Sequence, residues 1–379
     1  MHVGYALLTL FPGRVGGSET YARNLLAEYA TGVGPERVTV LANRHVMEAY
    51  RELETGPVSL HLVRTYRPGD SDLTRLLGMA RAAALPRRAA RDVPEGLDIV
   101  HYPVTVPIPA TRAKRVLALH DVQHHDLPDL FSAAERAYRR LAYDRAARRA
   151  DLVLTGAEHA KGRIVDVLGV EPERIEVVTH GIDHTRFTPE RRDREGLPAG
   201  IPPRFVLYPA NLWPHKNHER LLDALPLLAD KEVALVLTGQ DYGRLGALLE
   251  RARRLGVRER VHHLGHVAPA VLPALYRGAK ALVFPSLYEG FGAPPLEAMA
   301  CGCPVTTSDR ASLPEVCGDA ALYFDPDSPE SIAAALDRVL NDQETSARLR
   351  ADGLSWAARF TWRVSAERHQ AIYARVAAT

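Results

Sequence analysis

Short apolar runs alternate with helix-forming stretches along the whole chain, and this alternation constrains the fold more than any other feature. It is typical of parallel sheets built from strand–helix–strand units. The alternation stops in a polar, proline-rich stretch near Asp183–Pro203 and then starts again. The sequence therefore predicts an α/β protein with two Rossmann-like domains. The expected strands include Met1–Leu10, Val38–Leu41, Val58–Val63, Ile99–Tyr102, Val116–His120, Leu152–Leu154 and Ile175–Val178, then Phe205–Tyr208, Val233–Thr238, Val261–Leu264, Ala281–Phe284 and Val305–Thr307.

The restart places an N-terminal domain at residues 1–185 and a C-terminal domain at 186–360. Helical patterns at Ser331–Leu340, Thr345–Phe360 and Trp362–Val376 close the chain. In doubly wound sheets, ligands bind at the carboxyl ends of the strands, and a cleft between two facing domains is the default site. The motifs that directly follow strands are therefore the candidates for function.

Composition excludes several classes of protein. The chain has 379 residues, of which 46% are hydrophobic and 25% charged, as expected of a globular protein. A net charge of +2 gives no reason to expect a nucleic-acid partner, and three cysteines do not make a disulfide scaffold. The first residues lack a basic segment, and no run reaches the roughly 18–20 apolar residues needed to span a bilayer. We therefore expect a cytoplasmic protein.

The most specific motif joins two carboxylates, Glu289 and Glu297, across a Gly-Phe-Gly turn. The strand Ala281–Phe284 precedes it, and Pro294 and Pro295 suit the first turn of the helix that follows. The start of such a helix offers free backbone N–H groups and a partial positive charge, which together bind anions. A nucleoside diphosphate with a sugar on one side and a ribose on the other would fit between the two carboxylates.

Two further motifs follow strands of the second set. Lys216 lies just before the expected helix Glu219–Leu228, and a cation beside a helix N-terminus predicts a phosphate clamp. Lysine stands at only five positions in this arginine-rich chain, so a lysine within a motif is informative. After another strand, His266 and Val267 belong to a segment of small and apolar residues that is suited to sandwich a nucleobase.

The N-terminal half carries weaker signals. Gly16 and Gly17 follow the first strand and would let the backbone approach a phosphate or an acceptor, with Ser18 as the N-cap of a helix at Tyr21–Tyr29. Their spacing is not the Gly-x-Gly-x-x-Gly dinucleotide pattern, which weakens a nicotinamide interpretation. His120 ends a strand, where its ring can donate a hydrogen bond to a sugar hydroxyl.

The segment after His120 raises the question of a metal site. It holds His124 and His125 together with Asp121 and Asp126. Their spacing matches no standard zinc pattern, so we expect no metal there and assign His124 and His125 to a surface loop.

Two arginine-rich stretches, Arg75–Arg91 and Arg136–Arg149, are compatible with an anionic membrane surface near a lipid-linked acceptor. Solvated helix faces explain them as well, and we favour that interpretation.

Taken in order, these motifs resemble the retaining GT-B glycosyltransferases of family four over essentially the whole chain. The resemblance rests on Gly16-Gly17, His120-Asp121, His180-Gly-Ile-Asp183, Lys216, Gly265-His-Val267 and Glu289-Gly-Phe-Gly-Ala-Pro-Pro-Leu-Glu297. It implies two facing Rossmann-like domains with a cleft between them. The N-terminal domain would bind the acceptor, the C-terminal domain would bind a nucleotide-diphospho-sugar, and a final helix at 361–379 would pack back on the first domain.

The resemblance also implies roles for individual residues. Glu289, His120 and Lys216 would be the catalytic set: Lys216 holds the donor diphosphate, while Glu289 and His120 contact the transferred sugar. The donor-binding set would be Gly16, Gly17, Asn211, Lys216, His266, Val267, Gly290, Phe291, Gly292 and Glu297, with Glu297 on the ribose hydroxyls. The chain departs from the family at Asn211, where many members carry a second phosphate-binding arginine. Charge neutralisation would then depend on Lys216, helix dipoles and His215, with no metal and no cofactor besides the donor substrate.

The segments His120–Arg136 and Tyr288–Glu297 are most similar to mannosyltransferases of surface-polysaccharide assembly. The implied reaction moves mannose from GDP-mannose, with retention, to a hydroxyl of a glycan or lipid-linked acceptor; peripheral contact with the inner membrane face stays open. The alternatives are a transferase that uses a UDP-sugar (glucose or N-acetylglucosamine) and a sugar-nucleotide epimerase of the same fold. A nicotinamide oxidoreductase would need a better glycine pattern, and a two-lobed solute-binding protein would need an export signal.

Overall fold

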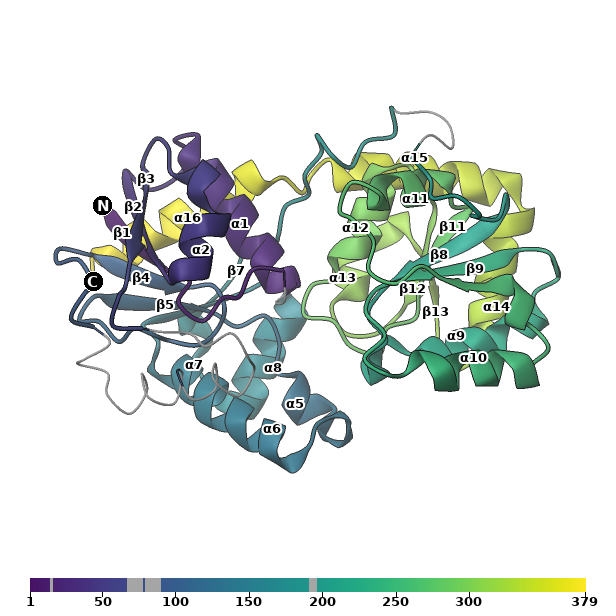
Figure 1. Ribbon diagram of the computed structural model, residues 1–379, viewed down its shortest axis with the longest axis horizontal. Helices are drawn as coiled ribbons and strands as arrows, with labels where there is room; N and C mark the ends of the chain where they lie inside the picture. Colours follow the sequence, from purple (N-terminus) through teal and green to yellow (C-terminus); the bar gives the residue numbers. More distant parts are fainter. Residues whose placement is uncertain (14–15, 67–77, 79–89, 191–195) are drawn as a thin grey trace. The chain divides into compact units, whose positions relative to one another are not determined.

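The computed structural model describes residues 1–13, 16–66, 78, 90–190 and 196–379. The chain forms two compact units (Figure 1). Unit 1 comprises Met1–Gly181 and Trp362–Thr379, and unit 2 comprises Ile182–Thr361. The two boundaries predicted from the sequence follow residues 185 and 360. Most of the Arg75–Arg91 stretch lies outside the described residues.

Unit 1 is built on a seven-stranded parallel sheet with the strand order β3-β2-β1-β4-β5-β6-β7. The central strand β1 pairs with β2 on one side and with β4 on the other. Its residues are fully buried, because helices cover both faces of the sheet. The strands are β1 (His2–Ala6), β2 (Arg37–Ala42), β3 (Val58–Leu62), β4 (Ile99–Tyr102), β5 (Lys114–Ala118), β6 (Leu152–Thr155) and β7 (Ile175–Val177).

Successive residues of β1 point to opposite faces of this sheet, as the period of a strand requires. Tyr5 belongs to the core beneath α1 and α16, whereas Ala6 belongs to the core beneath α7 and α8. Figure 1 shows the last helix, α16, lying beside α1, although more than 300 residues separate them in the chain. The helices of unit 1 are α1 (Gly17–Ala30), α2 (Arg44–Ala49), α5 (Gln123–Asp126), α6 (Ala133–Arg139), α7 (Arg145–Arg149), α8 (Glu158–Leu168) and α16 (Trp362–Ala377), with a π-helix at Arg140–Asp144 between α6 and α7.

Unit 2 contains a six-stranded parallel sheet with the order β10-β9-β8-β11-β12-β13. The predicted α/β class with two Rossmann-like domains is therefore confirmed. The strands are β8 (Phe205–Pro209), β9 (Ala234–Thr238), β10 (Val261–His263), β11 (Ala281–Phe284), β12 (Val305–Ser308) and β13 (Leu322–Phe324).

Two helices of unit 2, α14 and α15, begin at a side chain that caps the helix. The side chain of Ser328 accepts a hydrogen bond from Ser331 N at the start of α14, and that of Asp342 caps α15 in the same way. The helices are α9 (His218–Ala224), α10 (Leu245–Arg254), α11 (Leu272–Gly278), α12 (Ala293–Ala300), α13 (Leu313–Cys317), α14 (Pro329–Asn341) and α15 (Gln343–Ala357).

Candidate active site

The strand order of unit 2 defines where a ligand should bind. Strands β9 and β10 continue the sheet on one side of β8, and β11, β12 and β13 continue it on the other. The chain therefore reverses its direction of growth between β8 and β11. Crevices beyond the carboxyl ends of the strands at such a switch point bind ligands in open α/β sheets. Lys216 follows β8 and Glu289 follows β11, so the fold brings two predicted site residues to this point.

Lys216 is held by the backbone around it. It ends the 3-10 turn Pro214–Lys216, and its carbonyl oxygen accepts a hydrogen bond from the Tyr208 hydroxyl at 2.7 Å. The next residue, Asn217, has a φ of 60° and donates its side-chain amide to the carbonyl oxygens of Pro285 (3.1 Å) and Pro326 (2.8 Å). These bonds fasten the loop after β8 to the ends of β11 and β13.

Glu289 forms an ion pair with Lys216. The Lys216 Nζ lies 2.5 Å from the Glu289 Oε1, and each side chain is 13% exposed. The hydroxyl of the buried Ser312 donates to the carbonyl oxygens of Glu289 and Phe291, both at 2.9 Å. Ser312 thus fixes the Gly-Phe-Gly turn from the loop after β12, and both charges of the pair are held at the switch point.

The turn leads into α12 as the sequence predicts. Gly292 is the N-cap residue with a φ of 94°, a conformation that a residue with a Cβ rarely adopts. A Cβ there would also lie 2.8 Å from the Leu313 Cδ2. Pro294 and Pro295 occupy the first turn, where the missing N–H groups cost no intrahelical hydrogen bond.

Glu297 lies further along α12 and already has a partner. Its Oε2 accepts a hydrogen bond from the Tyr276 hydroxyl at 2.9 Å. Burial raises the pKa of Glu297, and this hydrogen bond and the charge of Arg186 oppose that rise. The implied contact of Glu297 with ribose hydroxyls stays a prediction.

The loops after β8, β9 and β10 are tied together. The Asn211 Oδ1 accepts a hydrogen bond from Gln240 N at 2.8 Å, and Gly239 N donates to the Gly265 carbonyl oxygen at 2.8 Å. His266, just after β10, is exposed, while Val267 is partly buried and packs against the core of unit 2. Asn211, His266 and Val267 therefore lie on the same edge of the sheet as Lys216, and their contacts with a donor stay predictions.

Sequence reasoning missed an exposed aromatic group on this edge. The Trp213 ring packs at a tilt against His215 and Tyr242, with ring centroids 5.7 and 5.6 Å apart. Trp213 is 41% exposed and Tyr242 is 52% exposed. Ser312 and Tyr276 were also not predicted from the sequence. They come from other loops and helices, and no local sequence pattern marks them as site residues.

Gly16 and Gly17 open the first helix of unit 1. Gly16 is the N-cap residue of α1 with a φ of 65°, and a Cβ on either glycine would meet no heavy atom of the described residues within 4 Å. The prediction that Ser18 caps this helix is wrong, because Ser18 lies inside its first turn. The helix starts earlier than predicted because glycine can take the positive φ at the cap. The contact of both glycines with a donor or an acceptor stays a prediction.

His120 lies two residues beyond β5 rather than inside a strand. Burial lowers the pKa of His120, although a hydrogen bond to the backbone of Pro103 acts in the opposite direction. Its Nε2 is buried and has no hydrogen-bond partner among the described residues. The ring packs edge-on against Tyr21 and His180, with centroids 5.1 and 5.3 Å away. The side chain thus faces a histidine–tyrosine cluster, and its contact with a sugar stays a prediction.

This cluster extends through the core of unit 1. The Tyr21 hydroxyl shares a hydrogen bond with the His369 Nε2 at 2.7 Å, and the Tyr373 hydroxyl shares one with the His101 Nδ1 at 2.6 Å. Burial lowers the pKa of His101, His120 and His180, and that of His369 to about 4. Near pH 7 the folded protein therefore keeps all four rings neutral.

Unit 1 is consequently expected to lose stability as the pH falls below about 6.5. The unfolded chain then binds protons that the folded state does not, so the free energy of unfolding drops by about 1.4 kcal/mol per pH unit for each neutral ring. Urea unfolding at pH 7.5 and 5.5, followed by Trp362 fluorescence in a Trp213→Phe, Trp356→Phe background, measures the loss. His369→Gln should weaken the pH dependence by about one proton, and equal stability at both pH values would refute the assignment.

Solved structures of other proteins share the fold of this chain. The chain superposes on Anabaena Alr3699/HepE, solved in complex with UDP-glucose, with a TM-score of 0.75, 20% identity and 99% coverage of each chain. It superposes on WaaG, a glycosyltransferase involved in lipopolysaccharide biosynthesis, with a TM-score of 0.71, 18% identity and coverage of 98% and 99%. Two Rossmann-like domains of this kind define the GT-B glycosyltransferase fold.

The family models and curated relatives agree. The model described as glycosyl transferases group 1 matches residues 190–356, and the model for glycosyltransferase family 4 matches residues 15–186. O-antigen chain mannosyltransferase B of Escherichia coli is 32% identical over 73% of this chain and 74% of its own length. Serotype-specific mannosyltransferase WbdA of the same species is 28% identical over 87% of this chain but only 44% of its own length. The chain belongs to glycosyltransferase family 4 and is a glycosyltransferase.

Among the described residues, no helix is both long enough and apolar enough to cross a membrane.

Proposed function

We propose that this glycosyltransferase moves mannose from GDP-mannose to a hydroxyl of a glycan or lipid-linked acceptor in surface polysaccharide or glycolipid synthesis, with retention at the anomeric carbon. The Lys216–Glu289 ion pair at the switch point of unit 2 carries this proposal. The mannosyl donor is supported by the similarity to O-antigen mannosyltransferases. The acceptor-binding role of unit 1 stays a prediction.

The charges of the pair match those of the reaction. As the bond between the sugar and the diphosphate breaks, the leaving group takes the electron pair and the sugar gains positive charge. Lys216 would stabilise the diphosphate, together with the N–H groups at the start of α12. Glu289 would stabilise the cationic sugar. The new bond forms to the acceptor oxygen, and the acceptor proton goes to the leaving phosphate on the same face of the sugar.

The structure also supports a rigid donor site. Charges contribute most to catalysis when they are already oriented before the reaction. Ser312 holds the backbone of Glu289, and Asn217 holds the loop that carries Lys216. The two side chains neutralise each other at 2.5 Å. A bound diphosphate would take over Lys216, and we propose that this works without a metal ion, since Lys216 and the helix start supply positive charge.

A thermal-shift panel tests the donor assignment. GDP, UDP, dTDP, ADP and NAD are each added with and without magnesium, and a nucleotide that binds only the folded state raises the melting temperature. We expect GDP to raise it equally in both conditions. Stabilisation by UDP alone would favour a glucose or N-acetylglucosamine donor instead. Stabilisation by NAD alone, or by no nucleotide, would contradict the proposal. Conversion of the donor without an acceptor would indicate an epimerase.

A further inference from the structure

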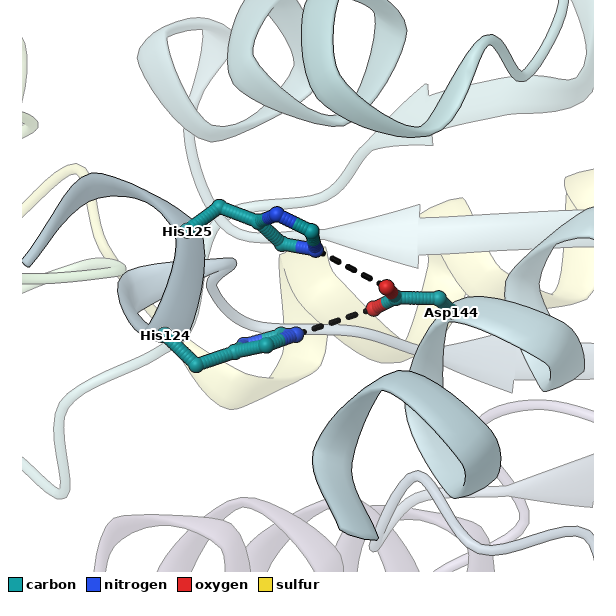
Figure 2. Close-up of side chains that lie close together, drawn as sticks. All are labelled: His124, His125 and Asp144. Carbon is teal, nitrogen blue, oxygen red and sulfur yellow. Dashed lines mark hydrogen bonds and ion pairs between the residues drawn. The ribbon is translucent and has the colours of Figure 1, made fainter. Parts of the chain in front are cut away.

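Two histidines and an aspartate converge in unit 1, whereas the Lys216–Glu289 pair belongs to unit 2. Figure 2 shows His124 and His125, both on α5, pointing at the carboxylate of Asp144, the last residue of the π-helix. The His124 Nε2 lies 2.9 Å from Asp144 Oδ1, and the His125 Nε2 lies 2.8 Å from Oδ2. Each of the three residues offers one possible metal-ligand atom, and these three atoms all lie within 4.8 Å of one another.

Within the described part of the chain, no lysine or arginine pairs with the carboxylate at the centre of this cluster. Asp144 is 3% exposed, and its ion pairs among the described residues are with His124 and His125 only. A buried carboxylate normally pairs with lysine or arginine or coordinates a metal. Several arginines lie nearby in the sequence, at positions 139, 140 and 145, yet none forms an ion pair with Asp144 in the described structure.

The backbone at Asp144 is unusual as well. Residues Arg140–Asp144 form a π-helix inside the longer helical segment that begins with α6 and ends with α7. A π-helical insertion of this kind is rare in proteins, but those that occur are frequently found at functional sites. The extra residue turns a side chain out of the regular helical direction. This segment ends at Asp144, and the side chain of Asp144 points at α5.

We propose that His124, His125 and Asp144 form a binding site for a divalent transition metal of the zinc class. Two imidazole nitrogens and a carboxylate suit zinc or cobalt, whereas magnesium and calcium prefer all-oxygen sites. His124 is fully buried and the His125 side chain is 18% exposed, so a water molecule could complete a tetrahedral site from the His125 side. The proposal does not depend on the proposed transferase function.

Metal binding would change the protons of the two rings. Each Nε2 needs its lone pair for the metal, so each ring would carry its proton on Nδ1, and the two hydrogen bonds to Asp144 would be replaced by metal–ligand bonds. The His124 Nδ1 is buried with no hydrogen-bond partner among the described residues. In the metal-bound form this nitrogen would carry a proton, and metal-ligating histidines almost always donate that proton to a further partner, so a metal-bound His124 would need a water molecule or a small movement there.

The site would act on the segment that follows His120. Helix α5 starts three residues after His120, and a metal would fasten α5 to the π-helix in place of two hydrogen bonds. The expectation that His124 and His125 are surface loop residues is wrong, because both belong to α5 and His124 is fully buried. The third ligand could not be predicted from spacing, because Asp144 lies 19 residues beyond His125 in the arginine-rich stretch.

Cobalt binding to tag-free, chelator-treated protein tests the site. We expect one Co²⁺ per chain with the intense visible absorption of tetrahedral cobalt, displaced by one Zn²⁺, and a higher melting temperature with either metal. Asp144→Asn and His125→Ala should weaken binding by more than the roughly 10–100-fold that loss of an outer-shell partner costs. His45→Ala, at a partly exposed histidine of α2 in the same unit, should bind as the wild type does.

The wild-type titration decides the matter even if a variant fails to fold. If chelator-treated wild-type protein takes up no Co²⁺ and its melting temperature does not respond to Zn²⁺, the cluster is a hydrogen-bonded contact and the proposal is overturned. Unchanged cobalt spectra in a folded Asp144→Asn protein would overturn it equally.

Discussion

Replacing Lys216 with alanine is expected to lower kcat/KM for the donor by roughly 10²–10³-fold, the usual effect of removing one group that stabilises developing negative charge. The structure holds this lysine at the switch point of unit 2, where it forms an ion pair with Glu289. Release of GDP from GDP-mannose, with and without a lipid-linked glycan acceptor, measures the effect. GDP itself should also bind more weakly, because the diphosphate loses its charged partner in the ground state.

Lys280→Ala is the matched control. Lys280 is exposed and precedes β11, at the amino edge of the same sheet, whereas Lys216 lies at its carboxyl edge. Its removal should leave donor kinetics unchanged. Comparable melting temperatures for both variants show that the uncompensated Glu289 has not unfolded unit 2. Equal activity of Lys216→Ala and wild-type protein would remove Lys216 from the donor site.

Replacing Glu289 with glutamine is expected to lower kcat by roughly 10²–10³-fold while GDP binds about as tightly as before. Glutamine keeps the shape of the side chain and an oxygen that accepts from Lys216, but it cannot stabilise a cationic sugar by charge. The two substitutions thus separate the two halves of the ion pair: Lys216 acts on the nucleotide, and Glu289 acts on the sugar during bond breaking. Steady-state kinetics and GDP titration on the same preparation measure both.

Glu250→Gln serves as the control for this change. Glu250 lies on α10 and is 53% exposed in a surface ion pair with Arg253, which should contribute little. Its kcat should equal that of the wild type. Near-wild-type transfer by Glu289→Gln would exclude a role for the charge of Glu289, and a large loss of GDP affinity would assign it to nucleotide binding instead.

The sequence predicted those features that depend on local patterns. Buried parallel strands are nearly continuous apolar runs, so Ile99–Tyr102 and Ala281–Phe284 were located to the residue. The glycine turn before α12 was equally clear, because Gly292 needs a positive φ and two prolines fit only a first turn. The order of motifs then placed Lys216 and Glu289 after strands that turn out to be neighbours.

Features that depend on contacts between distant segments could not be predicted. Ser312 fixes the Glu289 loop from 23 residues away, and Tyr276 reaches Glu297 from another helix. The cluster of His124, His125 and Asp144 appears only when a π-helix turns the aspartate toward α5. The His101–Tyr373 bond joins residues 272 positions apart in the core of unit 1. No spacing rule in the sequence encodes these pairs, because burial and the course of the chain create them.

Calorimetric titration of GDP in the presence of a chelator tests the central claim most directly, namely that the donor diphosphate binds at the switch point of unit 2 on Lys216. The account predicts that wild-type and Lys280→Ala proteins bind GDP with equal affinity without any divalent ion. It predicts at least tenfold weaker binding to Lys216→Ala, about 1.4 kcal/mol in binding free energy. Equal binding by Lys216→Ala, or binding that requires magnesium in the wild type, would contradict it.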